Sequence, residues 1–275
     1  MSIIVREEIE ARLGSVRGYV LDLDGVIYRG HTRLAHAREF LNALTAHGIP
    51  YIMATNNTMN TPEQYIAKLA GMGIDVPVDR ILTSAIATRG WLQEHYPAGT
   101  GVYVIGMPSL HEAIFSGGYF QPAGTYAEVV VVGADFGLTY EKLKITTLAI
   151  RNGATFVATN GDKTFPTEEG EIPGAGSIVA ALVASSGKEP VVVVGKPSPA
   201  MFLEAARILG TEPAETGMIG DRLDTDILGG ERAGFVTILV LTGVTRPEDA
   251  EASTIQADIV LPNLGPLVNY YRGDR

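Results

Sequence analysis

The stretch Gly18-Tyr19-Val20-Leu21-Asp22-Leu23-Asp24-Gly25-Val26 decides the fold of this chain. Mostly apolar residues run directly into two aspartates, and a glycine then ends the run. An apolar run of this kind is typical of a buried strand in a parallel sheet. Because side chains alternate along a strand, Asp22 and Asp24 are expected on the same side. Both lie where the strand ends, and open α/β sheets bind their ligands at the carboxyl ends of their strands.

The two aspartates allow two interpretations. Two carboxylates this close repel each other, and a divalent cation bridging them would relieve the repulsion. Alternatively, the strand simply ends in a polar turn, as most Asp-Gly pairs do. The other strand ends of the chain favour the first interpretation, as described below.

Composition narrows the possible classes of function. The chain has 275 residues, enough for a large core and one or two domains. Its net charge of −10 repels nucleic-acid phosphates, so no nucleic-acid partner is expected, and a small anionic ligand needs a local positive site. The absence of cysteine excludes disulfides, thiolate zinc sites and cysteine nucleophiles. The acidic start of the chain does not resemble a signal peptide, and residues 235–241, the longest apolar run, are too few to span a membrane. The sequence thus predicts a cytoplasmic protein.

Strand and helix signals alternate along the chain. Residues 51–55 form a second predicted strand, Thr61-Pro62 begins a helix, and residues 81–83 form a third strand. This alternation is typical of a parallel sheet with right-handed crossovers. Further strands are predicted in four places, at residues 191–194, 217–219, 235–241 and 259–261. The predicted fold class is α/β, with a Rossmann-like parallel-sheet core.

A second α/β domain is predicted inside the first. Glycine and proline become frequent between residues 97 and 124, and the block that follows has a strand and helix rhythm of its own. We therefore assign residues 1–84 and 188–275 to a core domain, and residues 85–187 to an inserted domain.

Four predicted strand ends carry polar groups that suit one task. These groups are Asp22 and Asp24; Thr55, Asn56 and Asn57; Lys196; and Asp221, Asp224 and Asp226. In a parallel sheet such ends point the same way, so the groups can converge on one crevice. Carboxylate oxygens suit magnesium, lysine supplies a compact positive charge, and threonine and asparagine supply hydrogen-bond donors. The sequence therefore predicts a receptor for a phosphate dianion bound beside a metal ion.

These four segments resemble the motifs of the haloacid dehalogenase superfamily of phosphotransferases. The matching segments are Asp22-Leu-Asp24-Gly-Val, Thr55-Asn56-Asn57, Gly195-Lys196-Pro197, and Gly220-Asp221-Arg-Leu-Asp224-Thr-Asp226. The Lys-Pro-Ser-Pro segment and the stretch 173–177 resemble the NagD-like branch, which includes 4-nitrophenyl, phosphoglycolate and nucleotide phosphatases. That branch carries a large α/β cap between its second and third motifs, where the inserted domain is predicted.

The resemblance implies a role for each aspartate. Asp22 would be the nucleophile that becomes an aspartyl phosphate, and Asp24 the general acid and then the general base. Asp22, the backbone carbonyl of Asp24, and Asp221 would bind Mg²⁺. Asp226 would hold a metal-bound water or orient Lys196.

The resemblance also implies how the phosphoryl group is held. Thr55 and the Asn56 backbone, with Asn57 in the same segment, would bind its oxygens, and Lys196 would neutralise them. The implied enzyme is a Mg²⁺-dependent phosphatase that acts on small phosphorylated metabolites. Phosphoryl transfer depends mainly on charge neutralisation and positioning, which agrees with this set of residues.

Several alternatives stay open at this stage. Thr55 and Asn56 also occur in simple turns, and Asp224 is interpreted as the cap of the helix that begins there. The segment Asn160-Gly161-Asp162 is either an ordinary turn or a part of the cap that faces the substrate. A dehalogenase of the same fold and a non-catalytic phosphoryl sensor compete with the phosphatase. The sequence leaves open which metabolite is the substrate, and a homodimer is expected by resemblance only.

Overall fold

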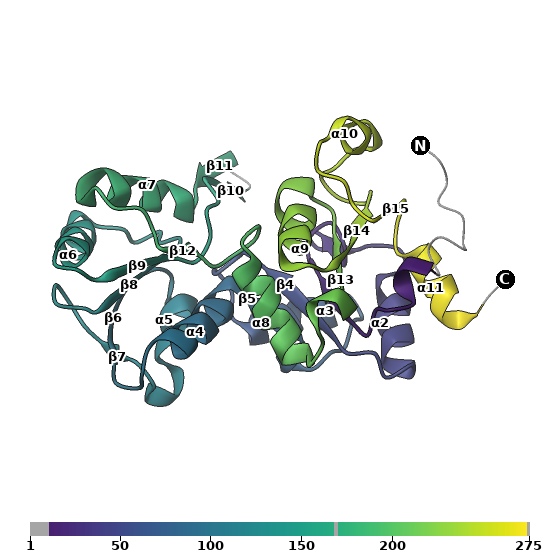
Figure 1. Ribbon diagram of the computed structural model, residues 1–275, viewed down its shortest axis with the longest axis horizontal. Helices are drawn as coiled ribbons and strands as arrows, with labels where there is room; N and C mark the ends of the chain where they lie inside the picture. The colour runs from purple at the N-terminus through teal and green to yellow at the C-terminus, as the bar shows by residue number, and fades with distance from the viewer. Residues whose placement is uncertain (1–10, 168–169, 274–275) are drawn as a thin grey trace. The chain divides into compact units, whose positions relative to one another are not determined.

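The computed structural model describes residues 11–167 and 170–273, and the chain divides into two compact units (Figure 1). The first unit comprises Met1–Thr55, Pro62–Leu82 and Lys196–Arg275. The second comprises Asn56–Thr61 and Thr83–Gly195. Each unit is built around its own sheet.

A six-stranded sheet forms the centre of the first unit, with the strand order β15-β14-β13-β1-β4-β5. Its strands are β1 (Gly18–Leu21), β4 (Tyr51–Thr55), β5 (Ile81–Thr83), β13 (Thr216–Gly220), β14 (Val236–Val240) and β15 (Ile259–Leu261). β1 pairs in parallel with β13 on one side and β4 on the other, so Leu21 lies opposite both Ile219 and Met53. All four residues of β1 are buried, as the apolar run predicted. The predicted α/β fold with a parallel-sheet core is confirmed.

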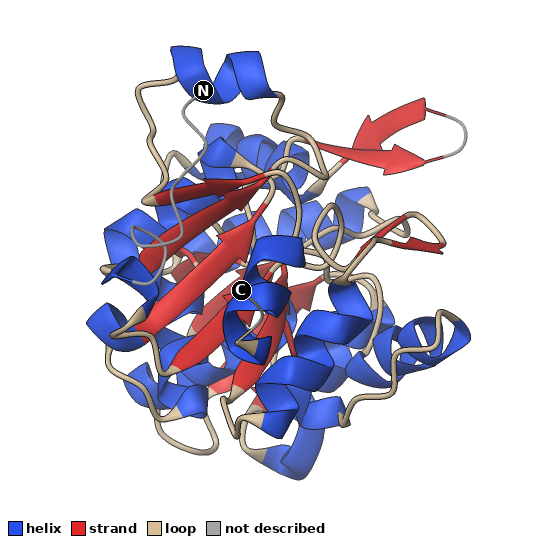
Figure 2. Cartoon of the chain, turned by 90° about the vertical axis from the view of Figure 1, so that its right-hand side faces the viewer, coloured by secondary structure: helices blue, strands red, loops and turns tan. Residues whose placement is uncertain are grey.

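Helices flank this sheet (Figure 2). They are α2 (Ala37–Ala46), α3 (Pro62–Gly71), α8 (Pro199–Leu209), α9 (Leu228–Ala233), α10 (Pro247–Ala252) and α11 (Gly265–Arg272), with short turns η1 (Val78–Arg80), η3 (Pro213–Glu215) and η4 (Leu223–Ile227). The buried rings of Tyr19 and Phe40 meet edge to face with centroids 5.7 Å apart, which joins β1 to α2 in one core. The Ser198 side chain caps α8 and Pro199 is its first residue, a sequence pair typical of a helix start. No helix in the described part of the chain has the length and apolar character needed to cross a bilayer.

The second unit contains a five-stranded sheet in the order β12-β9-β8-β6-β7. Its strands are β6 (Gly101–Ile105), β7 (Gln121–Pro122), β8 (Val129–Val132), β9 (Thr155–Ala158) and β12 (Val192–Val193), all paired in parallel. Its helices are α4 (Ser84–His95), α5 (Pro108–Phe115), α6 (Tyr140–Arg151) and α7 (Ala175–Ser186), with the turn η2 (Ser116–Gly118). β8 is buried along its whole length, as its four valines require.

The structure differs from the sequence interpretation at several connections. The strand predicted at residues 191–194 was assigned to the core domain, but β12 pairs with β9 in the second sheet, and the second unit extends from Thr83 to Gly195. A run of valines predicts a strand but not which sheet it joins, because pairing partners leave no local trace. Two antiparallel strand pairs lie outside the strands predicted from the sequence: β2 (Tyr28–Arg29) with β3 (Thr32–Arg33), and β10 (Thr164–Thr167) with β11 (Gly170–Pro173).

Candidate active site

The pairing of β1 with β13 brings two of the predicted acidic residues to one place. Asp22 follows β1 directly, and its backbone N–H donates to the Ile219 carbonyl at 2.9 Å, which continues the ladder by one residue. Asp221 follows β13 directly and is 2% exposed. Carboxylate oxygens of Asp22, Asp221 and Asp226 lie within 4.8 Å of one another. Three of the five carboxylates predicted to converge therefore lie together, whereas Asp24 and Asp224 are not members of this group.

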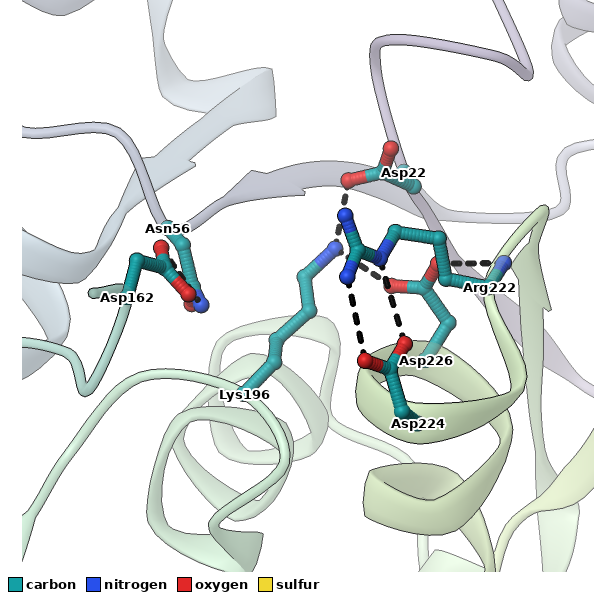
Figure 3. A network of polar contacts seen from close by, with 7 residues as sticks. All are labelled: Asp22, Asn56, Asp162, Lys196, Arg222, Asp224 and Asp226. Carbon is teal, nitrogen blue, oxygen red and sulfur yellow. Dashed lines mark hydrogen bonds and ion pairs between the residues drawn. The ribbon is translucent and has the colours of Figure 1, made fainter. Parts of the chain in front are cut away.

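Lys196 lies between two of these carboxylates (Figure 3). Its Nζ donates to Asp22 Oδ1 at 2.5 Å and to Asp226 Oδ1 at 2.8 Å. The Lys196 side chain is only 3% exposed, against 16% for Asp22 and 2% for Asp226. A lysine is buried this deeply only when its charge is paired, as the two carboxylates pair it here.

The charges of this cluster do not balance without a further positive charge. Three ionised carboxylates around one ammonium leave two negative charges in excess, in a region where burial makes repulsion expensive. Asp221 Oδ1 is buried and has no hydrogen-bond partner among the residues that the structure describes. An unpaired buried carboxylate oxygen is costly, and a divalent cation with oxygen ligands would satisfy both the charge and this atom. The residues present therefore fit a magnesium ion.

The electrostatics of the cluster agree with this conclusion. Burial raises the pKa of Asp22 to about 7; the Lys196 ammonium lowers this pKa, and the carboxylates of Asp226 and Asp221 raise it further. Burial and the Asp226 carboxylate raise the pKa of Asp221 to about 6. Burial alone would lower the pKa of Lys196, but the two carboxylates outweigh it and hold this pKa above its ordinary value. The lysine is thus firmly charged, and a cation beside Asp22 and Asp221 would favour the ionised forms of these two carboxylates.

Glycines allow the backbone to approach these carboxylates closely. A Cβ added at Gly220 would lie 2.1 Å from Asp226 Cβ, and one at Gly25 would lie 2.4 Å from Asp221 Cγ. A Cβ at Gly243 would lie 1.8 Å from Asp221 Oδ2. These three positions accept no side chain, because each would displace an acidic residue of the cluster.

Asp24 occupies a different environment from Asp22. Its side chain is exposed, and its backbone forms an isolated bridge with Tyr28, the first residue of the β2–β3 hairpin. The Nζ of Lys68 lies 3.8 Å from the centre of the Tyr28 ring, a cation–π contact. Burial lowers the pKa of Lys68 and the charge of Asp24 raises it, so the two charges lie within electrostatic reach. The Asp24 carboxylate is thus open to solvent, unlike those of Asp221 and Asp226.

The second motif lies where the two units meet in sequence. Thr55 is the last residue of β4, the neighbour of β1, so it belongs to the same sheet edge as Asp22. Asn56 and Asn57 belong to the second unit. The Asn57 side-chain oxygen accepts from the Met59 N–H at 2.7 Å, which makes Asn57 the first residue of an Asx turn.

Asp224 does not cap a helix, so that interpretation was wrong. Residues Leu223–Ile227 form a single π-helical turn whose N-cap is Arg222. The Asp224 carboxylate instead accepts from the Arg222 guanidinium at 3.2 and 3.0 Å. The wider turn directs Asp226 inward, where Oδ2 accepts from the Arg222 N–H at 3.2 Å.

The loop after β14 is a part of the site that the sequence interpretation missed. The Val244 N–H donates to Asp221 Oδ2 at 2.6 Å, and the Thr245 N–H donates to the Asp221 carbonyl at 3.1 Å. The Thr242 hydroxyl donates to the Gly25 carbonyl at 2.5 Å. The sequence did contain a signal for this loop: a glycine, Gly243, follows a buried strand just as Gly25 follows β1.

Comparison with known proteins identifies the family. Residues 19–119 match the family described as haloacid dehalogenase-like hydrolase, and residues 193–267 match a second HAD-hydrolase-like model. An acid sugar phosphatase of Staphylococcus aureus is 40% identical over 239 residues, 87% of this chain and 92% of that protein. The chain belongs to the haloacid dehalogenase-like hydrolases. The predicted family is confirmed, and so is the predicted enzyme class, a hydrolase of phosphoric monoesters.

Solved structures of this family share the fold along almost the whole chain. A 4-nitrophenylphosphatase of Thermotoga maritima is 35% identical with a TM-score of 0.86, covering 94% of this chain and 98% of that one. NagD of Escherichia coli K-12 is 30% identical with a TM-score of 0.84, covering 90% of this chain and 97% of that one. Both structures belong to the NagD-like branch, so the predicted branch of the family is confirmed.

Proposed function

We propose that this protein is a Mg²⁺-dependent phosphatase that hydrolyses small phosphomonoesters through an aspartyl phosphate on Asp22. The observation that carries the proposal is the buried cluster of Asp22, Lys196, Asp221 and Asp226, whose excess negative charge and unpartnered Asp221 Oδ1 call for a cation. The acid sugar phosphatase and 4-nitrophenylphosphatase relatives support the substrate class, since both are named for small phosphate esters.

In the first chemical step, a carboxylate oxygen of Asp22 attacks phosphorus. The phosphorus–oxygen bond to the leaving alcohol breaks, and Asp24 donates the proton that this oxygen needs. Mg²⁺, held by Asp22, Asp221 and the Asp24 carbonyl, would supply charge that neutralises the phosphoryl oxygens. Lys196 adds a second positive charge, and its contacts with Asp22 and Asp226 fix the direction of the nucleophile.

In the second step, water attacks the phosphorus of the aspartyl phosphate. Asp24 accepts the proton of this water, the acyl–phosphate bond breaks, and Asp22 returns as a carboxylate with release of inorganic phosphate. The exposure of Asp24 suits both roles, because its carboxyl group must meet a leaving alcohol and then water. Thr55 and the Asn56 backbone bind the phosphoryl oxygens in this proposal, together with Asn57. The second unit acts as the cap that excludes bulk water.

The experiment that tests this function is hydrolysis of 4-nitrophenyl phosphate and a panel of sugar phosphates with and without Mg²⁺. We expect turnover that EDTA abolishes and Mg²⁺ restores, and near-complete loss in Asp22→Asn. Asp249→Asn is the matched control, because Asp249 is an exposed aspartate on α10 of the same unit. Undiminished turnover in Asp22→Asn would refute the proposal.

A further inference from the structure

A buried asparagine of the second unit holds the segment that follows Thr55. Asn160 is 4% exposed, and its Nδ2 donates to the Asn56 backbone carbonyl at 2.9 Å. Its Oδ1 accepts from the Asp162 N–H at 3.1 Å, so the amide is held at both ends. Both Asn56 and Asn160 belong to the second unit. Neither the general acid, the nucleophile nor the metal ligands use this residue.

The same carbonyl receives a second hydrogen bond. Ser84 Oγ donates to the Asn56 oxygen at 2.6 Å, and Ser84 is fully buried at the start of α4. The Asn56 side chain is fixed as well, because its Nδ2 donates to Asp162 Oδ2 at 3.4 Å (Figure 3). Two donors satisfy both lone pairs of the carbonyl, which leaves the peptide plane between Asn56 and Asn57 one orientation.

A glycine makes room for this arrangement. A Cβ added at Gly195 would lie 2.6 Å from Asn56 Oδ1, 2.7 Å from the Thr159 carbonyl oxygen and 3.0 Å from Asn160 Cβ. The Gly195 N–H donates to the Thr159 carbonyl at 2.8 Å. Gly195, which directly precedes Lys196, therefore packs against Asn56 and Asn160.

Fixing the Asn56 carbonyl also fixes the orientation of the N–H that follows it. A trans peptide is planar, so the carbonyl of Asn56 and the N–H of Asn57 point in opposite directions. Holding the Asn56 carbonyl from Asn160 and Ser84 therefore also fixes the direction of the Asn57 N–H, within the segment that the proposed function assigns to the phosphoryl group. Hydrogen-bond donors act best on a phosphoryl group when they are oriented before it arrives.

We propose that Asn160 is a positioning residue that pre-orients the Thr55–Asn57 segment for the phosphoryl group, with Ser84 as its partner on the same carbonyl. This inference rests on the proposed function, because it assigns that segment to phosphate binding. Loss of Asn160 should weaken the binding of inorganic phosphate as well as catalysis, since the product shares the oxygens of the transferred group.

The test compares Asn160→Ala, Asn160→Asp and Ser84→Ala with the wild-type chain. In each alanine variant, kcat/KM for 4-nitrophenyl phosphate should fall about tenfold and the inhibition constant of inorganic phosphate should rise about tenfold, as expected for the loss of one positioning hydrogen bond. Asn160→Asp should lose more, because a carboxylate would face the Asn56 carbonyl. Asn152→Asp is the matched control, an exposed asparagine of the same unit.

Inorganic phosphate binding, measured by its effect on melting temperature, separates the two proposals. If the wild type binds phosphate but has no turnover, the proposed function is contradicted. Phosphate binding by the variants then still tests the role of Asn160 and Ser84. Unchanged phosphate affinity in folded Asn160→Ala, or in Ser84→Ala if the former does not fold, overturns the inference. A wild-type chain that binds no phosphate overturns it too.

Discussion

Replacing Lys196 by methionine removes the ammonium that Asp22 and Asp226 share while keeping much of the volume of the side chain. The structure allows the cost to be worked out. The Nζ lies 2.5 and 2.8 Å from its two carboxylate partners, and its side chain is 3% exposed, so solvent screens these ion pairs very little. Removing one partner of a buried ion pair costs about 3–5 kcal/mol, because the remaining charges lose their compensation.

The loss should depend on pH in a definite direction. Without the lysine, which lowers the pKa values of Asp22 and Asp221, these two carboxyl groups keep their protons to a higher pH, so the variant is least affected under acid conditions. We expect the deficit in the free energy of unfolding to be largest above the Asp22 pKa of about 7. The kcat of the variant should fall by about a hundredfold or more, since a charge that stabilises the transferred phosphoryl group is lost.

Urea unfolding at two pH values, with parallel assays of 4-nitrophenyl phosphate hydrolysis, measures both effects. Arg246→Met is the control, because the Arg246–Glu248 pair is long, at 3.9 Å, and its side chains are 75% and 69% exposed. This variant should stay within about 0.5 kcal/mol of the wild type. A Lys196→Met protein with wild-type stability and turnover would refute the assignment of this lysine.

Two further predictions follow from the same cluster. In the metal-free protein, Asp22 and Asp221, with pKa values of about 7 and about 6, bind protons that the unfolded chain releases near its ordinary value of 3.8. Stability should therefore decline as the pH rises from the unfolded value toward 7, and saturating Mg²⁺ should flatten this slope; melting in EDTA that improves over that range would contradict it. Gly243→Ala places a Cβ 1.8 Å from Asp221 Oδ2, so Mg²⁺ affinity by calorimetry should fall at least about tenfold. Gly71→Ala, which has no neighbour within 4 Å, should leave it unchanged, and equal affinities in the two variants would show that Asp221 tolerates displacement.

The sequence predicted those parts of the site that depend on strand ends. Asp22 and Asp221 each follow a buried strand of the same sheet, and neighbouring parallel strands bring their carboxyl ends together whatever the intervening residues do. The start of α8 at Ser198-Pro199 is also predictable from the sequence, because a serine followed by a proline is a local signal for the start of a helix.

Parts of the structure that depend on distant pairing were not predictable. The partner of β12 is decided by the register with β9, which the valine run does not contain. The inward turn of Asp226 and the outward pairing of Asp224 with Arg222 follow from one π-helical turn, which sequence periodicity does not distinguish from an ordinary helix start. The sequence places Asn160 in a segment interpreted either as a turn or as facing the substrate, but its bond to the Asn56 carbonyl joins residues 104 positions apart.

The central claim is that Asp22 carries the phosphoryl group, and trapping that group tests it most directly. Asp24→Asn, which lacks the proposed base for the second step, is mixed with Mg²⁺ and 4-nitrophenyl phosphate, whose leaving group departs without a proton from Asp24; the mixture is quenched in acid, digested and examined by mass spectrometry. The account predicts one phosphoryl group on the peptide containing Asp22, and none when Asp22 is also changed to asparagine. A phosphoryl group on any other residue, or turnover by the double variant, would contradict it.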